Sequence, residues 1–109
     1  FMVGGAVNAA FLNFSKALSK RGLVDGVNVN SINPGMTSTD RLITIIQSNA
    51  DREGISFAEA EKKALENIGL DRFGTPEEVA ELTYFLCNPN MRHLTGTEVN
   101  LDGGKKTTI

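Results

Sequence analysis

The stretch from residue 27 to residue 41, VNVNSINPGMTSTDR, constrains the fold of this 109-residue chain more than any other. Apolar and polar side chains alternate over residues 27–32, which is the pattern of a half-buried strand. Pro34 cannot extend a sheet ladder and Gly35 permits an unusual turn, so the strand has to end there. A hydroxyl-rich turn follows, in which Thr39 suits the N-cap of a helix. The stretch therefore predicts a strand, a sharp turn and a helix start.

Helical patterns lie on both sides of this stretch. Residues 1–21 repeat apolar side chains at the i, i+3, i+4, i+7 spacing of one helical face, and Gly22 follows as a stop. Residues 40–49 continue helically until a polar break. Ser56 and Glu59 then form a capping-box pattern, which predicts the start of another short helix.

The strongest local signal is the sequence Thr-Pro-Glu-Glu at residues 75–78. Thr75 suits the cap, Pro76 the first helical residue, and Glu78 the reciprocal partner of the cap. A second strand is predicted over residues 94–101, where apolar and polar residues alternate toward the end. The helix that begins at this cap has one face that we expect to be buried, which carries Val79, Leu82, Phe85 and Leu86.

The order of predicted elements is helix, strand, two or three helices, strand. Two strands joined by a helical crossover imply parallel pairing. A two-stranded parallel sheet is not a viable core, because parallel strands are normally covered on both faces and flanked by further strands. We therefore expect an incomplete α/β fold of about two strands and four helices. Its neighbouring strands would come from a missing N-terminal part or from another chain.

Composition narrows the possible functions. The net charge of −2 does not favour nucleic acid or an anionic membrane surface as a partner, and no apolar run approaches a membrane span. A single cysteine, Cys87, and a single histidine, His93, provide neither a disulfide framework nor a multi-ligand metal site. Cys87 suits packing and His93 a surface turn better than catalysis. We expect no metal and a cytoplasmic location.

Four motifs then occur in a recognisable order. Residues 8–18 read NAAFLNFSKAL, and residues 29–35 with Thr39 read V-N-x-I-x-P-G-x-x-x-T. Residues 72–80 read R-x-G-x-P-E-E-V-A, and residues 95–104 read T-G-x-x-x-x-x-D-G-G. Together they resemble the C-terminal portion of a short-chain dehydrogenase/reductase (SDR). The resemblance covers most of the chain.

The resemblance implies a doubly wound Rossmann-type parallel sheet. Residues 1–109 would be the C-terminal half of that domain, with residues 40–70 as a substrate-covering lid and the N-terminal dinucleotide-binding half absent. It also implies hydride transfer between NAD or NADP and a small alcohol or ketone, and a homo-oligomeric assembly. The residue that distinguishes NAD from NADP would belong to the missing half.

The resemblance also implies positions for cofactor contacts. Pro34 and Gly35 would lie beside the nicotinamide, where small residues permit a close approach of the backbone. The backbone around Thr37 and the hydroxyl of Thr39 would contact the carboxamide or the pyrophosphate, because a helix start offers free N–H groups. Read locally, the same residues only end a strand and cap a helix.

Two parts of the family pattern are missing. The phosphate-binding T-G-x-x-x-G-x-G turn does not occur, and no strand precedes Gly4 and Gly5. Aligning residues 8–18 with the family places Asn8 at the catalytic lysine and Gly4 at the catalytic tyrosine. Asn8 could hydrogen-bond a ribose hydroxyl but cannot supply a positive charge. We therefore assign no catalytic residue, and we expect Tyr84 to pack within its own helix.

Three functional hypotheses follow. The first is the C-terminal part of a divergent NAD(P)-linked oxidoreductase that is inactive on its own. The second is a non-catalytic SDR-like binding or assembly module. The third is an active enzyme whose altered proton relay uses residues outside this sequence.

Overall fold

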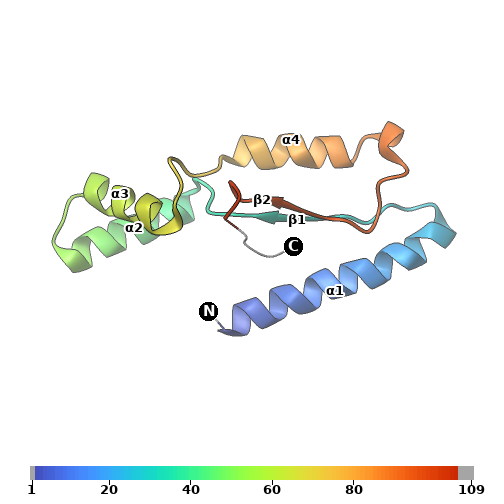
Figure 1. Cartoon of the computed structure of the whole chain (residues 1–109), viewed down its shortest axis with the longest axis horizontal. Coiled ribbons are helices and arrows are strands. Elements are labelled where there is room, and N and C mark those ends of the chain that lie inside the picture. The colour runs from blue at the N-terminus through green and yellow to red at the C-terminus, as the bar shows by residue number, and fades with distance from the viewer. Residues whose placement is uncertain (1, 106–109) are drawn as a thin grey trace. The chain divides into compact units, whose positions relative to one another are not determined.

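The computed structural model describes residues 2–105 as an α/β arrangement (Figure 1). Within them, two strands and four α-helices occur in the predicted order, so the predicted fold class is confirmed. The elements are α1 (Met2–Asp25), β1 (Ser31–Pro34), α2 (Asp40–Glu53), α3 (Phe57–Ile68), α4 (Pro76–Leu86), the 3-10 turn η1 (Pro89–Met91) and β2 (Glu98–Leu101).

The chain divides into two compact units. One consists of Phe1–Asn33 and Glu81–Val99, and the other of Pro34–Ala80 and Asn100–Ile109.

The strands β1 and β2 form a two-stranded parallel sheet, as predicted. In the first unit, the Ser31 N–H donates to the Thr97 carbonyl at 2.9 Å. In the second unit, the Gly35 N–H donates to the Leu101 carbonyl at 3.0 Å. Both bonds join residues at the same offset along the two strands, which fixes a single register.

The predicted strand over residues 27–32 is wrong in its bounds, because β1 comprises only Ser31–Pro34. The residues before it bind a loop instead of a neighbouring strand. The Asn28 amide donates to the carbonyls of Met91, Arg92 and Leu94 at 3.1–3.2 Å, and the Asn30 amide donates to the Leu94 carbonyl at 2.8 Å.

The second strand also starts later than predicted, at Glu98 rather than at residue 94. Gly96 has a φ of 70°, which takes the backbone out of the extended conformation just before the strand. Its N–H donates to the Val29 carbonyl at 2.7 Å, so this turn is held in the first unit.

The end of α1 differs from the prediction as well. Gly22 does not stop the helix but lies buried inside it, and α1 continues to Asp25. Gly26 is the residue with a left-handed φ, of 69°, and the Val27 N–H donates to the Gly22 carbonyl at 2.8 Å. This is the Schellman arrangement, in which the first residue with positive φ terminates the helix.

Both predicted capping boxes are confirmed. In α3, the Glu59 N–H donates to the Ser56 hydroxyl at 3.3 Å and the Glu59 carboxylate accepts from the Ser56 N–H at 2.9 Å. In α4, the Glu78 N–H donates to the Thr75 hydroxyl at 3.2 Å and the Glu78 carboxylate accepts from the Thr75 N–H at 2.8 Å. Each box pairs N–H groups that would otherwise have no helical acceptor.

Helix α2 begins after Thr39, as predicted, but it is longer than expected and runs to Glu53. Gly54 ends it with a φ of 66° and donates its N–H to the Ala50 carbonyl. The Thr39 side chain makes no cap hydrogen bond. The first turn of α2 therefore differs from the first turns of α3 and α4, where the side chains of Ser56 and Thr75 accept cap hydrogen bonds.

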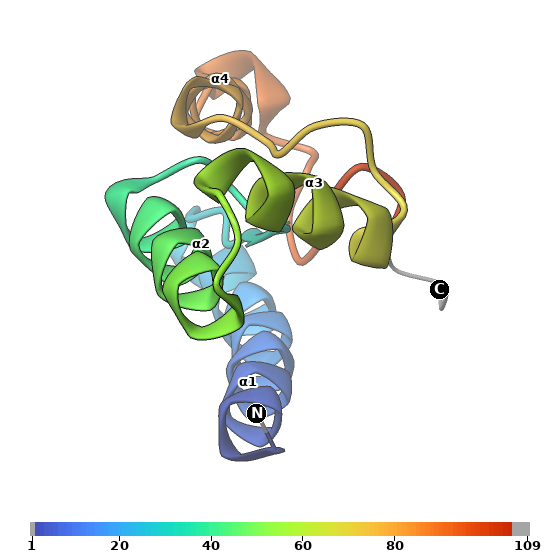
Figure 2. The ribbon, with the colours of Figure 1, turned by 90° about the vertical axis from the view of Figure 1, so that its left-hand side faces the viewer.

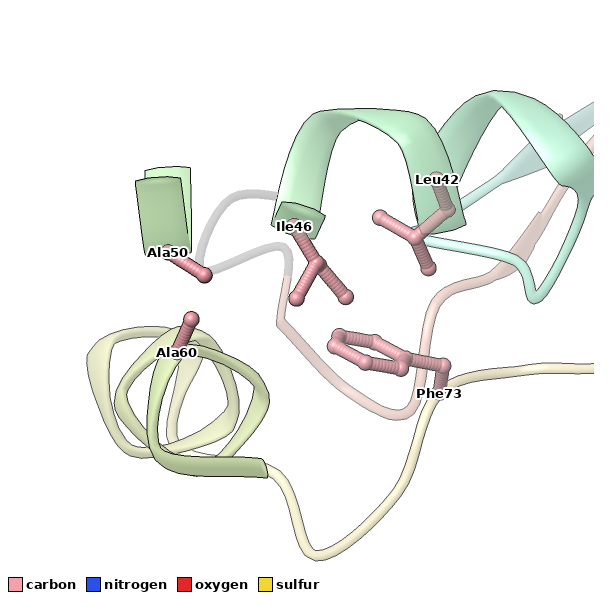
Figure 3. Packing of buried hydrophobic residues seen from close by; sticks show 5 residues of the cluster. All are labelled: Leu42, Ile46, Ala50, Ala60 and Phe73. Carbon is pink, nitrogen blue, oxygen red and sulfur yellow. The ribbon is translucent and has the colours of Figure 1, made fainter. Parts of the chain in front are cut away.

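Helices α2 and α3 lie side by side around a small hydrophobic core (Figure 2). One buried face comes from α2, and the ring of Phe73 closes the cluster from the segment after α3 (Figure 3). This core explains why residues 40–73 fold onto themselves. Between residues 2 and 105, the buried hydrophobic side chains are Leu42, Ile46, Ala50, Ala60 and Phe73.

The buried face predicted for α4 is wrong, because none of its residues is buried. Phe85 is 48% exposed, and Tyr84, which was expected to pack, is 76% exposed. The amphipathic pattern thus predicts the helix correctly but not its burial. The same holds for α1, where Phe11 and Phe14 are more than half exposed.

Candidate functional site

The segment predicted to contact a cofactor follows directly after β1, at the carboxyl end of the strand. Pro34 is exposed and Gly35 is half-buried. A Cβ atom on Gly35 would lie 2.9 Å from the Cα atom of Asp102. Glycine at this position is therefore required by the neighbouring backbone, whether or not a cofactor is bound.

Thr37 is held at this edge by backbone pairing with Gly74. The Gly74 N–H donates to the Met36 carbonyl at 3.0 Å, and the Ser38 N–H donates to the Gly74 carbonyl at 2.8 Å. The Thr37 hydroxyl donates to the Gly35 carbonyl at 3.1 Å. Thr37 is thus fixed by its own turn and by a segment that follows α3.

A charged pair anchors that second segment. The two terminal guanidinium nitrogens of Arg72 bind the two carboxylate oxygens of Glu78, Nη1 to Oε2 at 3.0 Å and Nη2 to Oε1 at 2.7 Å. Such a bidentate pair is stronger and more directional than a single contact. It spans the turn that leads into α4.

The Arg72 guanidinium, followed by the Thr75 N–H, lowers the pKa of Glu78 from 4.5 to about 2. The pair remains partly in contact with water, with 62% of the Arg72 side chain and 38% of the Glu78 side chain exposed. Solvent therefore screens the attraction, and its main effect is geometric.

We expect the pair to make stability depend on pH. Because the folded pKa of Glu78 is below its ordinary value of 4.5, its contribution is present above pH 4.5 and is lost as pH falls through about 2. Denaturant unfolding of the natural protein and of Glu78→Gln should give free energies that differ near neutral pH and converge at the acid end. Near neutral pH, Glu77→Gln, which removes a charge from the same helical turn, should cost less stability than Glu78→Gln. Parallel curves for the natural protein and Glu78→Gln would contradict the assignment.

A small cavity of about 240 Å³ lies within the second unit beside Thr37. Its apolar side comes from residues such as Leu70 and Val79, and its polar side from residues such as Asp71 and Arg72. Of the five residues predicted to bind a cofactor, Thr37 is the one that lines it. The complete lining is Met36, Thr37, Leu70, Asp71, Arg72, Gly74, Thr75, Glu78, Val79, Leu101, Asp102 and Gly103.

The structure brings four of the predicted cofactor residues together, because Pro34, Gly35, Thr37 and Thr39 follow one another along a single turn. Asn8 lies exposed on α1, in the other compact unit. The roles assigned to all five residues remain predictions.

Sequence reasoning missed the contribution of the segment around Gly74. The R-x-G-x-P-E-E-V-A motif supports the family resemblance and predicts the start of a helix, but it assigns no role to Arg72 or Gly74. The signal that could have revealed more was the combination of Arg72 with Glu78, which surrounds the glycine with opposite charges.

Among the side chains of residues 2–105, no group of three His, Cys, Asp or Glu residues is arranged to hold a metal ion. Within the same part of the chain, no helix has the length and apolar character needed to cross a membrane.

Parallel strands, a Pro-Gly turn at their carboxyl end and helices in the crossover define the C-terminal part of a Rossmann-type dinucleotide-binding fold. A family model described as enoyl-(acyl carrier protein) reductase matches residues 2–106. The chain therefore belongs to the short-chain dehydrogenase/reductase family, as the motifs predicted.

Individual relatives agree with this assignment. The NADPH-dependent reductase BacG of Bacillus subtilis is 33% identical over 103 residues, which are 94% of this chain and 40% of BacG. A short chain dehydrogenase family protein from Francisella tularensis superposes with a TM-score of 0.84 at 33% identity, over 92% of this chain and 41% of that one. L-sorbose reductase from Gluconobacter frateurii, crystallised with NADPH and L-sorbose, gives a TM-score of 0.85 at 29% identity, over 93% and 39%.

The chain thus spans about 40% of the length of each of these relatives. BacG is named as NADPH-dependent, and L-sorbose reductase was crystallised with NADPH.

Proposed function

We propose that this chain is the nicotinamide-side portion of an NAD(P)-dependent oxidoreductase that acts on a small alcohol or ketone. The observation that carries the proposal is the turn of residues 34–39, which leaves β1 at the carboxyl end of a parallel sheet. Ligands of open α/β sheets bind at that end of the strands. The reduced cofactor would donate a hydride to a ketone, or the oxidised cofactor would accept one from an alcohol, and the chain would supply a rigid backbone surface for the nicotinamide.

NADPH is the first cofactor to test. BacG and L-sorbose reductase both match nearly all of this chain. BacG is described as NADPH-dependent, and L-sorbose reductase was crystallised with NADPH. The sequence itself carries no residue assigned to read the adenosine ribose.

The first turn of α2 is suited to the carboxamide rather than to the pyrophosphate. Its N–H groups are not capped by the Thr39 side chain, so they can bind an external acceptor. Asp40 adds a carboxylate to the same turn. That charge would repel a pyrophosphate but not a neutral amide, which favours the carboxamide as the group that meets Thr39.

Residues 40–70 would cover the substrate. They form α2 and α3, which share a core and would therefore move together as one body. This motion would expel water from the nicotinamide.

The proton relay would come from residues outside this sequence. Gly4 and Asn8 occupy the positions that the family gives to its tyrosine and lysine, and neither can move a proton. The chain alone would then bind and orient but not turn over. We propose a homo-oligomer in the cytoplasm, in which the apolar side chains exposed on α1 are covered.

A second candidate is a non-catalytic SDR-like module that binds a dinucleotide or assembles with a partner. Asn8 favours this reading, because an amide can hydrogen-bond a ribose hydroxyl while lacking the charge needed for catalysis. In a natural protein that extends beyond these residues, NADPH binding without ketone-dependent oxidation of NADPH would support this second candidate over the first.

The test begins with the intact mass of the natural protein, which shows whether the polypeptide extends beyond these residues. NADPH is then titrated by its fluorescence into the natural protein and into Thr39→Val. Removal of one hydrogen-bonding hydroxyl is expected to raise the NADPH Kd by about 3- to 10-fold.

Thr44→Val is the matched control, because the Thr44 hydroxyl donates to the Asp40 carbonyl within α2 and is not assigned to the cofactor. It should leave the NADPH Kd unchanged. Equal Kd values for Thr39→Val and the natural protein would remove Thr39 from the site. A natural protein that does not bind NADPH or NADH would refute the proposed function.

A further inference from the structure

The Glu78 carboxylate is the common acceptor for three donors at the turn before α4. One oxygen, Oε2, accepts from the Thr75 N–H at 2.8 Å and from Arg72 Nη1 at 3.0 Å. The other, Oε1, accepts from Arg72 Nη2 at 2.7 Å. Removal of this side chain would release the start of α4 and the Arg72 guanidinium together.

These bonds fix two successive peptide groups, the one between Phe73 and Gly74 and the one between Gly74 and Thr75. Arg72 Nη1 also donates to the Phe73 carbonyl at 3.0 Å, while the Phe73 ring is buried in the core of the α2–α3 pair. The Thr75 N–H is held by Glu78. Gly74 lies between the two, so its N–H and carbonyl have little freedom to change direction.

Both of those groups pair with the segment predicted to contact the cofactor. Gly74 donates to the Met36 carbonyl and accepts from the Ser38 N–H, on either side of Thr37. The peptide groups that flank Thr37 are therefore positioned by Gly74, and Gly74 is positioned by Arg72 and Glu78. The three links lie within one compact unit.

A comparison within the same chain shows that a capping box does not need the arginine. The box at α3 uses Ser56 and Glu59, and its hydrogen bonds stay within the first turn of its own helix. The box at α4 has the same reciprocal pair of hydrogen bonds, with Thr75 as the cap, and adds a bidentate Arg72. The additional pair connects the cap to Phe73 and thereby to the turn that holds Thr37.

We propose that Glu78, acting through Arg72 and Gly74, is a positioning residue for the cofactor-binding turn of residues 34–39. Glu78 does not touch the cofactor in this assignment. It sets where the backbone on either side of Thr37 lies, and this rests on the proposed function of that turn.

Hydrogen exchange and NADPH titration of the natural protein test the assignment together. In Glu78→Ala, the Ser38 and Gly74 amides should exchange at least about tenfold faster, and the NADPH Kd should rise about tenfold. The Gly35 amide, which pairs with Leu101, should keep its protection.

Glu59→Ala is the matched control, because it removes the same residue from the same type of cap. It should lower the melting temperature to a similar degree while leaving the Ser38 and Gly74 exchange rates and the NADPH Kd unchanged. Glu78→Gln retains a neutral oxygen for the Thr75 N–H and should restore part of both the protection and the affinity.

Unchanged exchange of Ser38 and Gly74 in Glu78→Ala would overturn the inference. Faster exchange with an unchanged NADPH Kd would overturn it too, because the Arg72–Glu78 pair would then have no effect on the affinity for the cofactor. An equal rise in Kd for Glu59→Ala would show a general loss of stability instead of positioning. These outcomes leave the proposed function intact, whereas failure of the natural protein to bind NADPH would refute that function itself.

Discussion

Replacement of Phe73 by alanine is expected to lower the free energy of unfolding of the natural protein by about 3–5 kcal/mol. Phe73 is 6% exposed, and its ring packs against Leu42 and Ile46 in the core of the α2–α3 pair (Figure 3). Alanine would remove most of the ring and leave a cavity that two helices can only partly close. Because Gly74 follows directly, the loss should also loosen the pairing around Thr37. Chemical denaturation followed by circular dichroism measures the effect.

Phe73→Leu is the control for this prediction. Leucine keeps most of the buried volume, and such a swap usually costs less than about 1.5 kcal/mol. If Phe73→Ala were as stable as Phe73→Leu, the core around α2 and α3 would not contribute to global stability. The buried cluster would then unfold separately from the rest of the protein.

Replacement of Gly22 by alanine is expected to destabilise the protein by about 1–3 kcal/mol, although alanine is the better helix former. A Cβ atom on Gly22 would overlap the carbonyl oxygen of Val27. That oxygen belongs to the backbone, so the chain itself has to move. The 2.8 Å bond from the Val27 N–H to the Gly22 carbonyl, which closes α1, would be distorted. The melting temperature of the purified variant gives the measurement.

Gly5→Ala provides a matched comparison in the same helix. A Cβ atom on Gly5 meets no atom within 4 Å, so the substitution should raise stability by about 0.5–1 kcal/mol through helix propensity alone. Opposite signs for Gly5→Ala and Gly22→Ala would confirm that close packing, and not propensity, requires glycine at residue 22. A stabilised Gly22→Ala variant would show that the end of α1 is free to rearrange.

Features encoded within a few residues were predictable from the sequence. The boxes at Ser56 and Thr75 were predicted correctly because a cap, its partner three residues later and the first helical residue all lie in one turn. Thr39 was placed correctly as the residue before α2, for the same reason. Its lack of a side-chain cap bond was not predictable, since a hydroxyl at an N-cap usually makes one.

Features decided by distant contacts were not predictable. The start of β1 is set by Asn28 and Asn30, whose amides bind carbonyls of residues 91–94. The alternation of apolar and polar residues over 27–32 looks the same whether the polar side chains bind a loop or point to one face of a strand. The sequence pattern therefore does not predict where the strand begins. The end of α1 shows the same difficulty, because both Gly22 and Gly26 suit a helix stop, and packing decided between them.

The candidate site was predictable in part. Family motifs located Pro34, Gly35 and Thr37, which the structure places on one turn. They did not indicate that Asp102 lies against Gly35 or that Gly74 brackets Thr37, since these contacts depend on how the second strand and the α4 segment return. The exposed apolar faces of α1 and α4 are a further feature that the sequence predicts only in part. The sequence predicts such faces but not what covers them.

The separation of β1 and β2 along the chain has a consequence for how the protein folds. Val29 and Thr95, bonded just before the two strands, are 66 positions apart. The α2–α3 pair, in contrast, is closed by neighbours in sequence and carries its own glycine stops and cap. Closing a long loop costs entropy before the contacts it brings can compensate. The helix pair should therefore form early, as residues 40–73 leave the ribosome, and the sheet should close only after β2 has been synthesised.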